Sequence, residues 1–274
     1  MPSAGNRRRV PAIPGTPLPH GILGGCTEII DVTDPHELLG TDWQDGSCAD
    51  AHPWTWCTDD DPTGPKEFAR PTTCTAAPVT IYAGTQCNPV GRSYQEAVDS
   101  SLESLRMGEQ RALEQWVMSE VLCPLATAND LTPAAGALNI AQGVAVLEGW
   151  LGEHYGGVGV LHVPAGAAAL LDCCSLIHFD TGNARTLMGN CVIMGSGYGI
   201  NVGPAACLPA DPGEAWLYVT GPIRVRREGV FNIPDEDAQS VKITTNDRLV
   251  LAERTFVVEI ACCQAAAVRI EVCP

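Results

Sequence analysis

The sequence predicts an α+β protein with one very long helix, a long non-periodic region before it and a strand-rich last third. The helix is expected over residues 93–122, where apolar side chains recur at helical spacing behind a capping motif. Residues 38–90 lack such a period. After residue 222, apolar and polar side chains alternate with period two, as in strands. Together these patterns indicate an α+β chain with elongated elements.

The composition is that of a globular protein with an acidic balance. Hydrophobic residues make up 45% of the 274 residues and charged residues 18%, which fits one large domain or two modest ones. The formal net charge is −16, and only Lys66 and Lys242 are lysines. Such a chain is not expected to coat nucleic acid, although a container need only surround its cargo. No run approaches the roughly 18 apolar residues of a membrane helix.

The thirteen cysteines are expected to be free thiols. No signal peptide is visible, so synthesis in a reducing cytoplasm is predicted, where cysteines usually pack as small hydrophobes. Zinc is disfavoured because there is no C-x-x-C spacing, and the neighbouring cysteines occur as the doublets Cys173-Cys174 and Cys262-Cys263. No cofactor is expected.

The first 90 residues are predicted to be extended. Residues 1–25 contain five prolines and the basic run Arg7, Arg8 and Arg9, which indicates an arm that is expected to gain order only by lying on neighbouring subunits. Residues 28–61 hold ten acidic side chains and no Lys or Arg. The only strand-like run in the region is 78–82. A loop this long in a compact domain usually contacts a partner, and the tryptophans in it favour an interface. These are Trp43, Trp54 and Trp56.

The long helix begins at a capping box formed by Ser93 and Glu96 and ends near Pro124, with Gly108 as a place for a bend. At about 30 residues it would be roughly 45 Å long. A second helix is expected from Thr132, as cap, to about His154. A buried strand (158–163), a helix (165–175) and a strand ending in a glycine-rich turn (185–200) follow.

The last third is predicted to be strands. Residues 223–226, 256–260 and 268–272 alternate with period two, and the charged segment 235–237 lies between the first two runs. Two long strands bracketing residues 232–248 are therefore expected to form an extended hairpin.

The candidate chemistry along the chain favours ordinary structural explanations. The glycine-rich stretch 195–199 is followed by no long helix, so a turn is predicted instead of a dinucleotide site. A Cys–His nucleophile pair is possible in the central region, but core packing is favoured for His162 and His178. The acidic run 59–61 lacks the alternating ligands of a calcium loop. No catalytic, cofactor-binding or metal-binding residues are therefore predicted.

Several local phrases resemble the major capsid proteins of tailed bacteriophages, particularly those of actinobacterial phages, with the Hong Kong 97-type fold. They are residues 159–164 (GVLHVP), 182–183 (GN), 187–193 (LMGNCVI), 197–198 (GY), 216–227 (WLYVTGPIRVRR), 252–254 (AER) and 262–268 (CCQAAAV). The resemblance covers about residues 90–274 and concerns the order of segments more than any one motif.

The resemblance implies an N-terminal arm, an extended loop, a long spine helix, and peripheral and axial domains. The corresponding segments are the arm at 1–36, the loop at 37–90, the spine helix of the peripheral domain at 91–125, the axial domain at 126–221, the peripheral strands at 222–262 and an axial return strand at 263–274. It implies a structural protein that assembles with itself, as hexamers and pentamers, into an icosahedral shell around double-stranded DNA, and that is not an enzyme.

The resemblance also implies scaffold and portal partners, with decoration proteins as a further possibility, in a virion made in the host bacterial cytoplasm. Some relatives join their subunits by Lys–Asn isopeptide bonds, for which Lys66 is the only lysine in the loop region. The alternatives are an encapsulin-like shell, another virion component or a small cytoplasmic Cys/His hydrolase.

The expected contacts between subunits involve the arm and the loop. The basic residues Arg7, Arg8 and Arg9 are predicted to pair with the acidic segment 28–61 of another subunit. The loop is predicted to lay its tryptophans on a neighbour. Its carboxylates would then meet arginines that the subunit's own fold does not neutralise, and the candidates are Arg224, Arg226 and Arg227.

Overall fold

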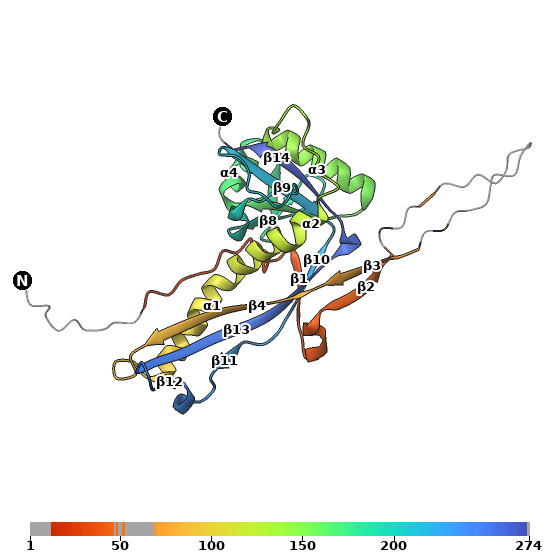
Figure 1. Cartoon of the computed structure of the whole chain (residues 1–274). Coiled ribbons are helices and arrows are strands. Elements are labelled where there is room, and N and C mark those ends of the chain that lie inside the picture. Colours follow the sequence, from red (N-terminus) through yellow and green to blue (C-terminus); the bar gives the residue numbers. More distant parts are fainter. Residues whose placement is uncertain (1–11, 47, 49–50, 53–67, 69, 273–274) are drawn as a thin grey trace, which may run out of the picture.

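The computed structural model describes residues 12–46, 48, 51–52, 68 and 70–272. Figure 1 shows a compact body, which holds the C-terminal strand, joined to an elongated part built around one long helix and two long strands. We call the compact body the axial domain and the elongated part the peripheral domain, after the segments that the resemblance assigns to them. A two-stranded projection leaves the elongated part on the opposite side from the N-terminal arm.

The axial domain is built on a six-stranded sheet of order β14-β9-β5-β8-β7-β6. Both faces of its central strands are buried: Val160 and Ile193 contact one apolar cluster, while Leu161 and Val192 contact the other. This explains why the strands read as continuous apolar runs. The strands are β5 (Val160–Pro164), β6 (Ile177–Asp180), β7 (Asn183–Thr186), β8 (Cys191–Gly195), β9 (Glu214–Thr220) and β14 (Ala265–Glu271), with helices α3 (Ile140–His154), α4 (Ala165–Cys173) and the 3₁₀ turn η3 (Gly197–Ile200).

The peripheral domain has a second six-stranded sheet, in which β13 runs through the centre. The path is β1-β10-β13-β11, and β4 and β12 also pair with β13. The expected hairpin is present, because β10 and β11 both run antiparallel to β13 across the charged tip. The elements are β1 (Thr27–Asp31), β4 (Pro78–Cys87), β10 (Ile223–Arg227), β11 (Phe231–Ile233), β12 (Val241–Lys242) and β13 (Asp247–Ile260), with the short helices η1 (Pro35–Leu39), η4 (Asp237–Gln239) and η5 (Ala261–Cys263).

The predicted long helix is present with its predicted start. Helix α1 covers Tyr94–Trp116, and both hydrogen bonds of the capping box between Ser93 and Glu96 form. It continues as a π-helical turn, η2 (Val117–Leu122), into α2 (Cys123–Leu125). Helix α1 lies against one face of β4 and β13, where Ser101 donates to the carbonyl of Val250 (3.0 Å) and Arg254 pairs with Glu109 (3.0 Å).

The second helix begins later than predicted. It starts at Ile140, with Asn139 as the cap accepting from the amide of Gln142. Residues 130–138 run along β14 instead: Leu131 donates to the carbonyl of Ala267, and the Thr132 hydroxyl accepts from the amide of Arg269. The Thr-Pro cap signal was therefore wrong, because the edge strand offers this segment hydrogen-bond partners that the sequence does not reveal.

The region 38–90 is more ordered than predicted. Strands β2 (Thr41–Asp45) and β3 (Thr72–Ala76) pair antiparallel, and β4 pairs with β13 along all of its ten residues. The inward-facing side chains of β4 are those of Val79, Ile81, Ala83, Thr85 and Cys87. Because several of these are small or polar, the alternation of apolar and polar residues along β4 is weak in the sequence.

The described part of the N-terminal arm belongs to its own subunit, which corrects the expectation that residues 1–25 gain order only on neighbours. Ile22 is fully buried in the core. The carbonyl of His20 accepts from the amide of Met194 (2.8 Å), and Arg106 donates to the carbonyl of Gly15 (2.7 Å). Residues 1–11 lie outside the described residues.

The expectation of free thiols is contradicted by four disulfides. They join Cys26 to Cys191, Cys48 to Cys262, Cys74 to Cys263 and Cys123 to Cys207, and Cys87, Cys173 and Cys174 are free. The paired cysteines are separated by 84 to 214 positions, so no local spacing could reveal them. Within the described residues, no helix has the length and apolarity needed to cross a membrane.

Candidate functional site at the root of the extended loop

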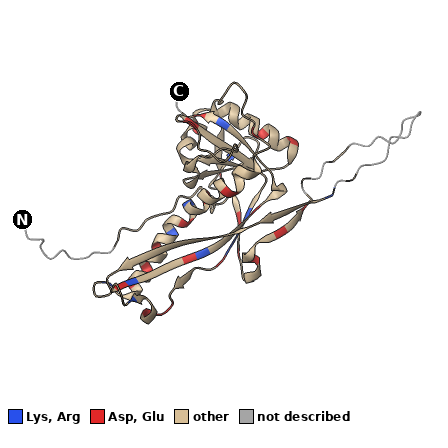
Figure 2. Ribbon diagram, in the orientation of Figure 1, with Lys and Arg blue, Asp and Glu red and all other residues tan. Residues whose placement is uncertain are grey.

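Strand β10 presents a row of arginines to the acidic strand β1. The two strands are parallel, and their register places Glu28 opposite Arg224 and Asp31 opposite Arg227. Both pairs close as ion pairs, at 2.8 Å and 2.6 Å. The Arg227 guanidinium holds the pKa of Asp31 below its usual range by donating a hydrogen bond to the carboxylate. Acidic and basic residues accordingly lie close together where β1, β10 and β13 meet in Figure 2.

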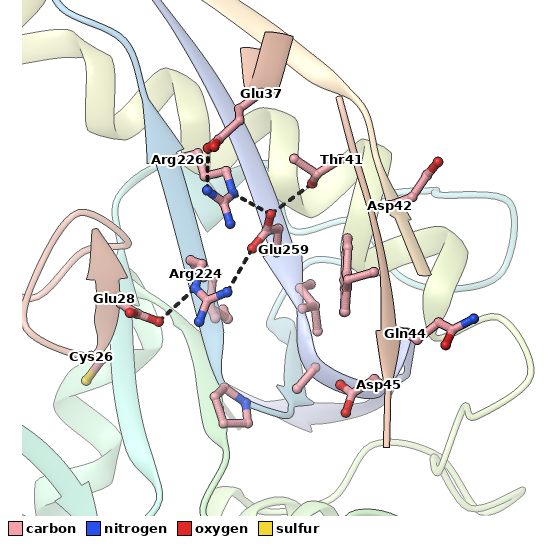
Figure 3. Close-up of a pocket in the computed structure, with 15 residues that line it drawn as sticks. Cys26, Glu28, Glu37, Thr41, Asp42, Gln44, Asp45, Arg224, Arg226 and Glu259 are labelled. Carbon is pink, nitrogen blue, oxygen red and sulfur yellow. Dashed lines mark hydrogen bonds and ion pairs between the residues drawn. The ribbon is translucent and has the colours of Figure 1, made fainter. Parts of the chain in front are cut away.

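A buried carboxylate from β13 joins this row to the loop. Glu259 accepts from Arg226 Nε (2.6 Å) and from the Thr41 hydroxyl (2.9 Å), and its second oxygen lies 3.5 Å from Arg224. Arg226 also reaches Glu37 on η1 at 2.5 Å. Figure 3 shows Arg226 between Glu37 and Glu259, and Arg224 between Glu28 and Glu259. The hydrogen bond to Glu259 is the main reason why the pKa of Arg226 is raised.

The loop strand β2 is fastened beside this network. Thr41 begins β2 and donates to Glu259, and Asp45 ends β2 and accepts from the amide of Cys262 (2.6 Å). Between β2 and the β10–β13 pair lies an open cleft of about 750 Å³, lined by carboxylates, Trp43, Arg224 and Arg226. The site therefore joins the arm, the loop and the peripheral sheet at one place.

The three arginines predicted for intersubunit contact are instead neutralised within the chain. Arg224, Arg226 and Arg227 are each paired with acidic residues of β1, η1 or β13. The premise that the subunit's own fold leaves these arginines unneutralised is wrong, because β1 and η1 fold back onto β10; a contact of the three arginines with another subunit stays a prediction. Trp43 is half-buried on β2, opposite Cys74 on β3. The remaining candidates, Arg7, Arg8, Arg9, Trp54 and Trp56, lie outside the described residues.

Among the described residues, no hydrogen bond joins a histidine of the central region to a cysteine, so no nucleophile–base pair forms there. His162 is buried, and its ring nitrogens meet the Tyr198 hydroxyl (2.8 Å) and the Thr220 hydroxyl (3.0 Å). Thr220 donates to the carbonyl of Gly221, so it accepts from His162 Nε2, and Tyr198 donates to Nδ1. Burial lowers the pKa of His162 to about 3. Core packing is thus confirmed for His162, whereas His178 is exposed on β6.

No metal centre emerges from the described residues. The one group of ligand-type side chains that lies close together there is Asp45, Cys48 and Cys262. The two sulfurs of this group are bonded to each other, which removes the thiolates a soft metal would need.

Sequence reasoning missed two groups that fasten the arm and the loop. The first is the disulfides, for which the sequence gives no signal, because the doublet Cys262-Cys263 is paired whereas the doublet Cys173-Cys174 is free. The second is Glu114 on α1, whose two carboxylate oxygens accept from the amides of Ile22 (3.0 Å) and Gly197 (2.7 Å). Burial raises the pKa of Glu114, against the opposing effect of these amides.

No protein-family model matches the sequence, and no curated protein matches it. Solved structures match its fold over nearly the whole chain. A chain of Microbacterium phage Oxtober96 is 12% identical, with a TM-score of 0.56, over 97% of this chain and 95% of that one. The capsid of a native GTA particle is 14% identical, with a TM-score of 0.56 and the same coverage. A chain of Mycobacterium phage Ogopogo is 14% identical, with a TM-score of 0.52, over 96% of both chains.

These matches establish the fold. The chain has the α+β fold of Hong Kong 97-type capsid proteins, as the resemblance implied, with an arm, a loop, a spine helix and two domains.

Proposed function

We propose that this chain is the major capsid protein of a tailed bacteriophage and assembles with itself into an icosahedral shell around the double-stranded DNA genome. The observation that carries this proposal is the likeness of nearly the whole chain, in fold, to a chain of a solved particle capsid. The subunit is proposed to act structurally and not as an enzyme. Its net charge of −16 supports enclosure of DNA without a strong grip on the phosphates.

The subunit also exposes an apolar sheet face of the kind that usually contacts a partner. Helix α1 lies on one face of the β4–β13 pair, and the other face presents Tyr82, Phe231, Ile233 and Leu249, which are 71%, 52%, 45% and 42% exposed. The register brings them together, because Tyr82 and Phe231 both lie opposite Glu253, and Ile233 lies opposite Leu251. A cleft of about 730 Å³ runs over this face, which we call the outer sheet face.

The proposed occupant of the outer sheet face is the extended loop of a second copy. The loop contains Trp54, Trp56 and Phe68, and Phe68 is 89% exposed in its own subunit. The root of the loop and the outer sheet face lie toward different ends of the elongated part, so the contact would be head to tail. Burying one large aromatic or aliphatic side chain contributes about 1.5–3 kcal/mol, and symmetry repeats each contact around a shell.

The proposal places the protein in the virion after synthesis in the host bacterial cytoplasm. A shell of this kind requires an entry point for DNA and a guide for its curvature, for which a portal and a scaffold are proposed as partners, with decoration proteins as a further class. The basic run Arg7, Arg8 and Arg9 remains proposed as a contact with an acidic surface of another subunit. Glu28, Asp31 and Glu37 are already paired within their own subunit, so this contact is proposed to involve acidic residues outside β1 and η1.

Sedimentation and negative-stain imaging of the purified protein test the proposal. Closed shells or capsomers are expected, whereas a particle the size of one subunit, or a tube, would overturn it. Variants Ile233→Asp and Leu249→Asp should keep the circular dichroism of the subunit and lose assembly, because each places a carboxylate in the contact. Leu187→Asp, changed at a side chain that is 83% exposed in the axial domain, should still assemble. Assembly by both outer-face variants would refute the proposed contact.

A further inference from the structure

Three of the four disulfides fasten the projecting segments to the two domains. Cys26, immediately before β1, is bonded to Cys191 at the start of β8 and so ties the arm to the axial domain. Cys48 follows β2 and Cys74 lies in β3, so these two cysteines hold the two strands that lead into and out of the extended loop. The Cα atoms of each pair are 5.5 to 5.7 Å apart, the usual separation for bonded cysteines.

Both loop cysteines are held by adjacent residues at the junction of the two domains. Cys262 and Cys263 belong to η5, which connects β13 of the peripheral sheet to β14 of the axial sheet. Both have left-handed backbone, with φ of 63° and 48°, which is uncommon for residues other than glycine. This conformation turns two neighbouring side chains toward two different loop strands, Cys262 toward Cys48 and Cys263 toward Cys74.

Non-covalent contacts bring the same groups together. Asp45 accepts from the amide of Cys262, Thr41 donates to Glu259, and β2 pairs with β3 from Thr41 to Asp45. The folded chain thus positions the four sulfurs through backbone pairing and through the loop root. The cysteines are suited to oxidation after folding, and the fold selects which partner each one takes.

We propose that Cys262 and Cys263 form a double clamp, closed by oxidation of the folded subunit, that covalently fixes the root of the extended loop to the junction between the two domains. In each half of the clamp, one thiolate attacks a low-molecular-weight disulfide such as oxidised glutathione and releases one small thiol. The second cysteine then attacks this mixed disulfide, the protein S–S bond forms and the second small thiol leaves. The two electrons and two protons of the protein thiols thereby pass to the small disulfide.

The clamp has a consequence for a shell, and this part of the inference rests on the proposed function. If a neighbour holds the loop of each subunit, the force on that contact passes through β2 and β3 into η5. The closed clamp carries the force through covalent bonds, whereas an open clamp leaves it to side-chain hydrogen bonds. Oxidised shells should therefore resist heat better than reduced ones.

Cysteine mapping of the native protein tests the chemistry. Alkylation under denaturing, non-reducing conditions should leave Cys48, Cys74, Cys262 and Cys263 unmodified. The free residues Cys87, Cys173 and Cys174 should be modified in the same sample, which confirms that the reagent reached the chain. Full alkylation of Cys262 and Cys263, both in purified protein and after incubation with oxidised glutathione, would overturn the clamp.

Hydrogen exchange tests the mechanical role. In a Cys48→Ser/Cys74→Ser variant, amides of β2 and β3 should exchange at least about tenfold faster than in the parent protein, because the strands can separate from η5 without global unfolding. The matched control, Cys173→Ser/Cys174→Ser, changes two exposed free cysteines and should exchange like the parent. Unchanged exchange in the clamp variant would refute the role.

Shell measurements separate this inference from the proposed function. Heating should open clamp-variant shells at a lower temperature than oxidised parent shells, and reduced parent shells, which lose all four disulfides, should open at or below the temperature of the variant. Equal resistance of all three would overturn the clamp while leaving the capsid proposal intact. If the parent and the control both fail to assemble, the capsid proposal fails, and mapping and exchange on the subunit still decide whether the clamp exists.

Discussion

Replacing Glu259 by glutamine is the sharpest test of the network at the loop root. The carboxylate side chain is only 9% exposed and lies 2.6 Å from Arg226, whose side chain is 18% exposed. At an effective dielectric constant of about 20, two unit charges about 4 Å apart attract by about 4 kcal/mol, and desolvation of the carboxylate offsets part of this. Glutamine keeps an acceptor for Thr41 but leaves Arg226 in a partly buried place with one carboxylate fewer. We expect Glu259→Gln to destabilise the subunit by about 2–4 kcal/mol.

The matched control is Glu28→Gln. Glu28 also pairs with Arg224, at 2.8 Å, but its side chain is 60% exposed, so water screens the pair. Removing the charge of Glu28 should lower the free energy of unfolding by about 0–1 kcal/mol. Urea unfolding of the unassembled subunit, followed by tryptophan fluorescence, measures both variants. Equal costs for the two substitutions, or a cost below about 0.5 kcal/mol for Glu259→Gln, would show that burial does not set the strength of this network.

Three further predictions concern the arm and the axial core. Ile22→Ala should cost about 2–4 kcal/mol in urea unfolding, because Ile22 is fully buried; Ile13→Ala, at a side chain that is 95% exposed, should cost almost nothing, and equal costs would contradict the docked arm. Lowering the pH from 7 to 5 should destabilise the subunit by about 2 kcal/mol through His162, because its pKa of about 3 in the fold is lower than in the unfolded chain, which therefore takes up the proton first. His162→Gln should remove this part of the pH dependence, and an unchanged slope would argue against a neutral buried histidine. Glu114→Gln should lower the free energy of unfolding by about 1–3 kcal/mol, because the glutamine side chain has one acceptor oxygen, whereas the amides of Ile22 and Gly197 each donate to a separate carboxylate oxygen. Unchanged hydrogen exchange at Ile22 would refute that role.

Much of the fold was accessible from local pattern. The capping box at Ser93, the strand before α4 and the alternation along β10 and the end of β13 were predicted near their observed positions. Each depends on residues close in the chain, because caps, helical faces and strand alternation are set by neighbours within a few positions. The Thr132 signal failed for the complementary reason, since its partner is the amide of Arg269 on a distant strand.

The candidate site was harder to predict because it is assembled from three distant segments. The sequence shows an acidic stretch and a row of arginines. It does not show that β1 runs parallel to β10, so that the acidic and basic side chains neutralise each other. It likewise shows thirteen cysteines but not which of them face one another.

The sequence by itself determined the class of fold, the long helix and the acidic charge, because composition and short-range periodicity carry these properties. Only the tertiary structure decided which charges are neutralised inside the subunit, which cysteines pair and which sheet face remains exposed. These depend on how segments up to 214 positions apart pack together, and a burial pattern along one strand does not specify its partner.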